Sequence, residues 1–397
     1  MPPKLPPPVA YVSVPAAFAP SSWHRMEQCA LSVWAADAAV LPESAKAAAG
    51  RVLHAARETI WKLGLFGPAA TAAVRAVVED VLVSHERHHG AGLVRALGSR
   101  RWLERTLELE QWARSVVRPP YQGRAVPGAF ASEDDARDDR FVLGVEEPWR
   151  ASALRLRGRP DESHLTTSGS VEVCDYKTGR VTGRDGALLP AIETQMRLYL
   201  LMAEHLSGRR ATGKVHGGEE LVVPWDDETR SATVRRVASF GERFPANARF
   251  SAGDVATPGS HCVGCGLRPR CATYLAQAPG WWLNSGSHPR PLPFDTWGIA
   301  TDVVQEELGA TVSLDDAGGR RVRVRGLSSD HALTTASVGV PLFMFDLVPT
   351  EDTTQHGRRI QPRSFHEKSP GARWPSAWRA QVFQLDRRAP QSSESVS

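Results

Sequence analysis

The stretch Gly158-Arg-Pro-Asp161, followed by Val171-Glu-Val-Cys-Asp175-Tyr-Lys177-Thr-Gly179, decides the fold of this chain. Strands are predicted over residues 151–157 and 170–176, with turn residues between them. An aspartate ends the first of these strands, and an Asp-x-Lys ends the second. Such a hairpin can bring both carboxylates and the amine to one end of adjacent strands.

These three residue types suit metal-assisted chemistry. Two carboxylates are hard oxygen ligands, which Mg²⁺ and Mn²⁺ prefer. A bound metal lowers the pKa of a water and neutralises charge on a phosphate, and Lys177 can orient that water and stabilise the developing charge. Because an isolated Asp-x-Lys is common, the alternative is an exposed hairpin with solvated charges.

Two predicted helices flank this hairpin. The first, over residues 44–65 with Ser44 as its N-cap, places Gly50, His54 and Glu58 on one face. The second, over residues 190–205, places Gln195 and Tyr199 on one face. The alternatives are a packed or capping histidine and a core tyrosine. Further helices are predicted over residues 69–89, 92–117 and 228–244, and further strands over residues 141–146 and near 220–225.

In this order, the motifs resemble the RecB-like family of PD-(D/E)xK nucleases. That family uses Gly-x-x-x-His, Gly-x-x-Asp, Asp-Tyr-Lys-Thr-Gly and Gln-x-x-x-Tyr, and the likeness covers residues 21–275. It implies an α/β, restriction-endonuclease-like core with a helical N-terminal region. It also implies metal ligation by His54, Asp161, Asp175 and the backbone carbonyl of Tyr176, catalysis by Lys177, and positioning of DNA by Gln195 and Tyr199.

Three of the five cysteines form a Cys262-x₂-Cys265-x₅-Cys271 cluster. Three thiolates on a tight loop need a fourth ligand. A zinc site could use His261 or a distant cysteine, whereas an iron–sulfur cluster takes four thiolates. A subset of RecB-like nucleases, including the AddB type and CRISPR-associated exonucleases, carries one cysteine before the histidine motif and three with this spacing after the Gln-x-x-x-Tyr helix. The resemblance therefore implies a [4Fe-4S] cluster on Cys29 and these three, with structural Zn²⁺ as the alternative.

After residue 279 the chain changes character. Strands are predicted over residues 296–305, 310–314, 320–326 and 341–348, with a hairpin turn over 315–319. They indicate a small β-domain of the OB type, which commonly binds single strands. Arg321, Arg323 and Arg325 alternate with valines and can follow a phosphate backbone. Trp297, Phe343 and Phe345 could stack on bases. The alternatives are a solvated arginine face and core aromatics.

Composition limits the remaining possibilities. The net charge is +4, so a basic surface has to be local. There is no apolar run of membrane-spanning length, and the proline-rich start does not fit a signal peptide, so a cytoplasmic protein is expected.

The stretch His85-Glu-Arg-His-His89 matches a zinc-protease pattern, but it precedes glycines at a helix end, where histidines meet the helix dipole. A protease is therefore disfavoured.

The resulting expectation is a Mg²⁺- or Mn²⁺-dependent deoxyribonuclease that trims single-stranded DNA from ends. A non-enzymatic DNA-binding subunit with a vestigial site is the competing hypothesis. No Walker A pattern occurs, so any helicase or ATPase would be a separate partner. Recombination, repair, CRISPR adaptation and antiviral defence would all accept this chemistry. The expected division is an extended lead-in over residues 1–20, a nuclease domain over 21–279, the β-domain over 280–386 and a disordered tail over 387–397.

Overall fold

The structure is a computed structural model. It describes residues 1–41, 45–89, 92–115, 139–177, 179–217, 219–283, 294–306, 309–315, 321–327, 331–349, 354–355, 358–359, 364–367 and 381–385. The expected N-cap Ser44, almost all of the loop expected over 118–139, the turn residues 316–319 and the expected tail lie outside the described residues. Within the described ranges, no helix combines the length and the apolar character needed to cross a membrane.

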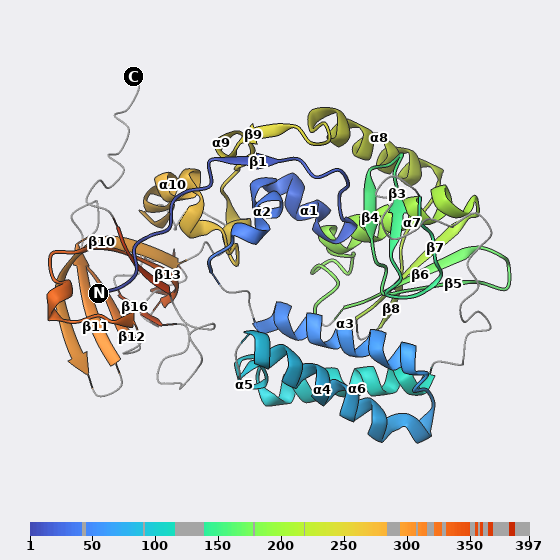
Figure 1. The fold of residues 1–397 in the computed structure, drawn as a ribbon, viewed down its shortest axis with the longest axis horizontal. Helices are drawn as coiled ribbons and strands as arrows, with labels where there is room; N and C mark the ends of the chain where they lie inside the picture. Colours follow the sequence, from blue (N-terminus) through green and yellow to red (C-terminus); the bar gives the residue numbers. More distant parts are fainter. Residues whose placement is uncertain are drawn as a thin grey trace.

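A five-stranded sheet in the order β2-β5-β6-β7-β8 forms the centre of the part of the chain before the C-terminal strands. Helix α7 packs on one face of this sheet, and α1 and α8 pack against α7. Helices α3, α4 and α6 pack on one another and form a separate layer in Figure 1. The helices are α1 (Pro20–Gln28), α2 (Leu31–Trp34), α3 (Ala45–Leu63), α4 (Thr71–His89), α5 (Leu93–Leu97), α6 (Ser99–Ser115), α7 (Pro190–Ser207), α8 (Asp227–Arg243), α9 (Ala252–Val255) and α10 (Ala272–Leu283).

The helices expected over residues 44–65, 69–89, 190–205 and 228–244 are confirmed as α3, α4, α7 and α8. The single helix expected over 92–117 is wrong, because the chain forms two helices, α5 and α6. They are separated at Gly98, whose φ of 98° lies in the left-handed region that glycine adopts at little cost.

The hairpin that carries the aspartates also differs from the predicted one. Residues 151–157 contribute only to the ends of β3 (Trp149–Ala151) and β4 (Leu156–Gly158) and to the turn between them. The antiparallel partner of β6 (Val171–Tyr176) is instead β5 (Glu162–Leu165). Since Glu162 pairs with Cys174, Asp161 at the start of β5 still lies at the same sheet edge as Asp175 at the end of β6.

Strand β7 (Ala211–His216), which lies between β6 and the edge strand β8, was not predicted from the sequence. It pairs in parallel with β6, and β8 (Glu220–Val222) continues the sheet in antiparallel. Its inward positions carry small side chains, and a Cβ on Gly213 would lie 3.1 Å from Leu200 Cδ1 and 3.2 Å from Met196 Cε of α7. Small residues that let α7 approach the sheet also remove the apolar alternation by which strands are recognised. At the opposite edge, β2 (Gly144–Val145) pairs with β5.

The C-terminal strands form a barrel. The strands expected over 296–305, 310–314, 320–326 and 341–348 are confirmed as the first four of the set. Pairing runs β10-β11-β12-β16-β13 and returns to β10, with β12 and β16 parallel and the other pairs antiparallel, so five strands close on themselves as in a small OB-like barrel. The strands are β10 (Phe294–Glu306), β11 (Gly309–Asp315), β12 (Arg321–Leu327), β13 (Pro341–Pro349), β16 (Ser364–Glu367) and the added β17 (Gln381–Gln384); β14 (Thr354–Gln355) and β15 (Arg358–Arg359) form a separate pair.

The barrel aromatics do not serve the role suggested by the sequence. Phe343 and Phe345 are buried, and their rings stack on each other with centroids 4.4 Å apart. Trp297 is partly buried against the same core. The alternative stated for these residues, core packing, is therefore the correct one for the two phenylalanines. By contrast, Arg321, Arg323 and Arg325 are exposed on β12.

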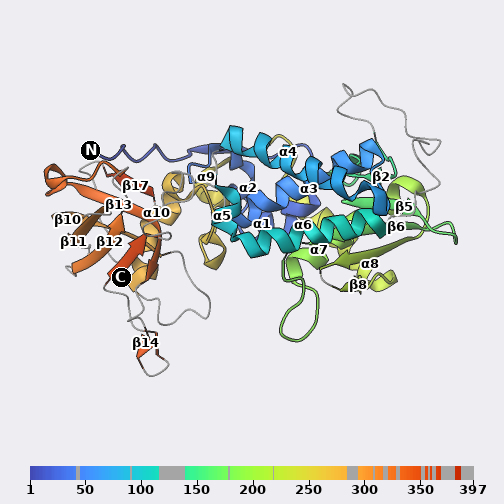
Figure 2. The ribbon, with the colours of Figure 1, turned by 90° about the horizontal axis from the view of Figure 1, so that it is seen from below.

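A buried charge network joins the nuclease region to the barrel. The guanidinium of Arg268 is almost fully buried and forms ion pairs with Asp295 at 3.1 Å and with Asp346. The hydroxyl of Tyr274 donates to Asp295 at 2.5 Å. The N-terminal segment also spans both parts: β1 (Tyr11–Ser13) pairs with β9 (Arg249–Ser251), and the backbone of Leu5 bonds to β17. Figure 2 shows this segment running from the barrel along α9 toward α1 and α2.

Candidate active site

Asp161 and Asp175 meet at the edge of the central sheet. The backbone N–H of Tyr176 donates to Oδ2 of Asp161 at 2.6 Å, so the loop before β5 is tied to the end of β6. Both carboxylates are buried, with 6% of Asp161 and 1% of Asp175 exposed. The structure thus brings the two aspartates of the motif together in a largely water-excluded place.

Lys177 and Gln195 hold the second of these carboxylates. Nζ of Lys177 lies 2.9 Å from each oxygen of Asp175 and donates a hydrogen bond to Oδ1. The Gln195 amide donates to the same oxygen at 3.0 Å and accepts from Lys177 at 3.1 Å. Oδ2 of Asp175 is buried and receives no hydrogen bond. The Lys177 ammonium nevertheless lies 2.9 Å from this oxygen and supplies positive charge beside it.

His54 of α3 reaches the same edge together with a residue that was not predicted. Its Nδ1 lies 2.8 Å from Oε1 of Glu146 and 3.4 Å from Oδ1 of Asp161. Glu146 follows β2 with a φ of 55°, and its N–H donates to the carbonyl of Asp161 at 3.2 Å. One ligand atom from each of these three side chains lies within 4.8 Å of the others. The only sequence signal was an acidic pair, Glu146-Glu147, at the end of a predicted strand.

Burial and charge act in opposite directions on these groups. Burial raises the pKa of Asp175, and Lys177 offsets part of that rise. Burial would lower the pKa of Lys177, but Asp175 and Asp161 raise it above its ordinary value. Burial would likewise lower the pKa of His54, and the hydrogen bond with Glu146 and the charge of Asp161 raise it overall. The carboxylates therefore create a negative field that favours any nearby cation.

Tyr199 supports the site from α7 without facing solvent. It is 2% exposed, and its hydroxyl donates to the carbonyl of Arg159 at 2.9 Å. A Cβ on Gly158 would lie 2.8 Å from Cε1 of Tyr199, so only glycine fits where this ring meets the chain. The ring and the glycine of the two motifs thus set the path of the loop that carries Asp161.

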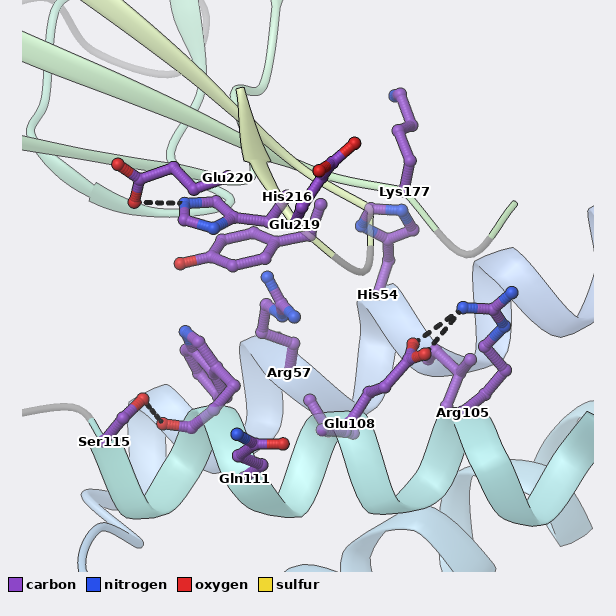
Figure 3. A pocket seen from close by; sticks show the side chains of 14 residues that line it. His54, Arg57, Arg105, Glu108, Gln111, Ser115, Lys177, His216, Glu219 and Glu220 are labelled. Carbon is purple, nitrogen blue, oxygen red and sulfur yellow. Dashed lines mark hydrogen bonds and ion pairs between the residues drawn. The ribbon is translucent and has the colours of Figure 1, made fainter. Parts of the chain in front are cut away.

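A cavity of about 330 Å³ opens beside the two basic groups of the site, His54 and Lys177. Figure 3 shows it between α3, α6 and the residues around the ends of β6 and β7. Arg57, a second residue that the sequence did not reveal, is buried in its wall. Its guanidinium carbon lies 3.5 Å from the ring centroid of Tyr176 and 4.5 Å from that of Trp112. His216 stacks on the other face of Tyr176 at 4.8 Å, so this ring is fixed on both faces.

The residues at this edge fit a divalent metal ion. Carboxylate oxygens from Asp161 and Glu146 and an imidazole nitrogen from His54 converge there, and the carboxylate of Asp175 lies at the same sheet edge. This set of hard oxygens with one nitrogen suits Mg²⁺ or Mn²⁺. The positively charged groups that face the carboxylates, Lys177 and His54, are the ones whose pKa values are raised.

The four cysteines of the second predicted site line one small cavity. Cys29 follows α1, and the other three come from the loop between α9 and α10. Backbone N–H groups of Gly259 and Tyr274 donate to the sulfurs of Cys262 and Cys271, each at 3.4 Å. Burial raises the pKa of Cys262 to about 12. The structure thus brings together four thiols of which the first and last, Cys29 and Cys271, are 242 residues apart in the chain.

The spacing of these sulfurs bears on the kind of site. Among the described residues, no three of the four sulfur atoms lie within 4.8 Å of one another. Four thiolates around a single tetrahedral zinc ion lie about 3.8 Å apart, given Zn–S bonds of about 2.3 Å. In this structure the four sulfurs therefore do not have the separations of a site that holds a single zinc ion.

In the zinc-protease pattern at the end of α4, the glutamate caps the next helix. The carboxylate of Glu86 accepts the backbone N–H groups of Gly92 and Leu93, both at 2.9 Å, and so caps the start of α5. The rings of His85 and His89 lie next to each other at the helix end. The described residues of this segment supply no group of three metal ligands.

Comparison with known families agrees with this geometry. The sequence profile of the PD-(D/E)XK nuclease superfamily matches residues 17–272, which is well over half of the chain. The chain therefore belongs to this superfamily, whose members are metal-dependent nucleases. A search of curated proteins gave no match. The matched segment contains every residue of the aspartate–lysine edge and the whole cysteine cage.

The position of Glu146 leads to a prediction about metal affinity. Glu146→Gln removes a charge that faces both His54 and Asp161, so Mn²⁺ should bind roughly tenfold to hundredfold more weakly. Isothermal titration calorimetry measures this affinity. Glu147→Gln, which removes a charge one residue further along, is the matched control and should bind Mn²⁺ as the wild type does. Equal affinity of the Glu146 variant and the wild type would show that Glu146 has no part in the metal site.

Proposed function

We propose that this chain is a metal-dependent DNA exonuclease of the RecB-like kind, which prefers single strands and is stabilised by a [4Fe-4S] cluster. The observation that carries the nuclease proposal is the convergence of Asp161, Asp175 and Lys177 at one buried sheet edge beside an open cavity. The superfamily membership supports hydrolysis of phosphodiester bonds. Strand preference, exonuclease action and the cluster go beyond that membership.

The residues of the edge have distinct roles in this proposal. His54, Asp161, Asp175 and the carbonyl of Tyr176 would hold Mg²⁺ or Mn²⁺, with Glu146 against His54. Such an ion supplies an activated water and neutralises charge on the phosphate. Lys177 remains protonated beside Asp175, where it can orient the attacking water and stabilise charge on the phosphate oxygens. Gln195 fixes the positions of both groups.

Two features support a single-stranded substrate. The cavity beside His54 and Lys177 has a volume of about 330 Å³, which is enough for one nucleotide of a single strand. The exposed arginines lie on β12, the third strand of the barrel, which pairs with the second strand β11. OB folds hold oligonucleotides on the face of these two strands. In this proposal, Arg321, Arg323 and Arg325 contact the phosphate backbone. Because Tyr199 is buried, its contribution to DNA positioning is made through the loop of Arg159.

A non-enzymatic DNA-binding subunit is the second candidate, because the same barrel face could bind DNA without cleavage. For both candidates, any helicase or ATPase would be a separate protein. The intact hydrogen-bond network around Asp175 favours the enzyme. The two candidates differ in one measurable outcome, cleavage.

Cleavage of end-labelled linear and circular single-stranded DNA with Mn²⁺ tests the proposal. The wild type should shorten the linear strand and leave the circle intact, because an exonuclease requires an end. Asp175→Ala should abolish cleavage by removing a metal ligand. Lys177→Ala should slow it by about 10²–10³-fold, which is the effect of removing one group that stabilises transition-state charge.

Asp254→Ala, which removes an exposed carboxylate from α9, is the matched control and should cleave at the wild-type rate. Absence of cleavage by the wild type, or unchanged cleavage by Asp175→Ala, would favour the binding subunit. Cleavage of the circle at the rate of the linear strand would replace the exonuclease proposal with an endonuclease.

The cluster proposal rests on the cysteine cage and on the segments that close it. Backbone N–H groups of Val40 and Leu41 donate to the carbonyl of Gly266, and a Cβ on Gly266 would lie 2.8 Å from the carbonyl oxygen of Leu41. The chain near Cys29 is therefore packed directly on the cysteine loop. A cluster on these four thiolates would fasten the two ends of the nuclease region together and contribute to folding free energy.

Anaerobic purification tests the cluster directly. The wild type should be brown, with about four iron atoms per chain, as expected for the [4Fe-4S] form. Cys29→Ser should lose the visible absorbance and the iron, because it removes one of the four ligands. Cys174→Ser, at a buried cysteine outside the cage, should keep both. A colourless wild type with stoichiometric zinc would contradict the iron–sulfur proposal and support the zinc alternative.

A further inference from the structure

The face of the central sheet opposite α7 carries a second group of metal-ligating side chains. In β6, Val171, Val173 and Asp175 point toward α7, so Glu172 and Cys174 point to the other face. In the antiparallel register of β5 and β6, His164 pairs with Glu172. Three different ligand types, from two adjacent strands, therefore project from one side of the hairpin.

Their ligand atoms are close together. Nε2 of His164 lies 3.3 Å from Oε1 of Glu172, and Sγ of Cys174 lies 3.9 Å from the same oxygen. All three atoms lie within 4.8 Å of one another. In the wider cysteine cage no three sulfurs approach this closely, so the two sites differ in the size of the group that they can hold.

These separations are close to those around a zinc ion. Tetrahedral geometry with Zn–N and Zn–O bonds of about 2.0–2.1 Å places nitrogen and oxygen about 3.3 Å apart. A Zn–S bond of about 2.3 Å places sulfur and oxygen about 3.6 Å apart. The observed 3.3 Å from His164 to Glu172 matches the first of these separations, and the 3.9 Å from Cys174 to Glu172 exceeds the second by a few tenths of an ångström. One imidazole, one carboxylate and one thiolate form a donor set that binds Zn²⁺ more tightly than Mg²⁺.

Neighbouring charges orient the three ligands. Nδ1 of His164 lies 3.7 Å from Oε1 of Glu162, which matches the carboxylate–histidine pairing that holds zinc-binding imidazoles in place. Glu162 is itself fixed by the hydroxyl of Tyr176 at 2.7 Å. Lys214 lies 3.4 Å from Oε2 of Glu172 and thus leaves Oε1 directed toward His164 and Cys174.

We propose that His164, Glu172 and Cys174 form a second metal site, which takes one Zn²⁺ and keeps a fourth position for water. On binding, the Cys174 thiol gives up its proton to solvent and its sulfur becomes a thiolate ligand. The ion joins β5 to β6 on the side of the sheet away from Asp175. Because Asp161 immediately precedes β5 and Asp175 lies in β6, the site fastens the hairpin that carries both catalytic carboxylates.

Co²⁺ is the probe for this site, because its bond to a thiolate gives an absorption in the near ultraviolet that bonds to oxygen or nitrogen do not give. Anaerobically purified protein is titrated with Co²⁺, and the wild-type spectrum is compared with that of Cys174→Ser. The wild type should bind one Co²⁺ with the thiolate band, and the variant should lack the band. Any Co²⁺ bound at the four-cysteine cage or at the aspartate edge contributes equally to both spectra, so it does not appear in the difference between them.

His164→Ala tests the same site without altering a buried residue, since the imidazole is half-exposed. It should bind Co²⁺ at this site at least tenfold more weakly than the wild type. The zinc concentration that displaces Co²⁺ from this variant should be no higher than the concentration that displaces it from the wild type. His205→Ala, at a similarly exposed histidine of α7, is the control and should keep the wild-type band. A wild type without a Cys174-dependent band, or a His164→Ala variant with unchanged affinity, would overturn the proposal. Neither outcome affects the nuclease assay.

Discussion

The hydrogen bond from the backbone N–H of Tyr176 to Asp161 is the interaction on which the candidate active site depends. It joins the loop before β5 to the end of β6, two segments that are 15 residues apart in the chain. The antiparallel register brings these segments to the same edge, and the hydrogen bond fixes the orientation of the Asp161 carboxylate. Tyr199 and Gly158 then set the path of the same loop from the opposite side.

Two acidic groups this deeply buried require compensation, which neighbouring side chains supply. Lys177 and Gln195 bond to Asp175, while His54 approaches Asp161 from α3. Glu146 adds a third carboxylate beside His54 and Asp161, so this edge favours a further cation. That preference connects the electrostatics of this edge to the chemistry of the superfamily.

The sequence predicted the residues of this site better than the strands that carry them. Asp161, Asp175 and Lys177 could be found because each lies in a short local motif. Glu146 could not, because its place beside His54 depends on a left-handed turn and on a contact 92 residues away. Strand β7 was missed for a related reason: Gly213 is selected by the close approach of α7, and that constraint leaves no alternating apolar pattern. Long-range packing, rather than local propensity, determined both features.

The central claim is that Asp161 and Asp175 share a divalent metal ion at the sheet edge. Crystals of the protein soaked in Mn²⁺, with diffraction data collected at the manganese absorption edge, test this most directly. An anomalous peak should appear between the two carboxylates and the carbonyl oxygen of Tyr176, with metal–oxygen distances of about 2.0–2.3 Å. If the crystals bind Mn²⁺ elsewhere but show no anomalous peak at the sheet edge of Asp161 and Asp175, the claim is contradicted.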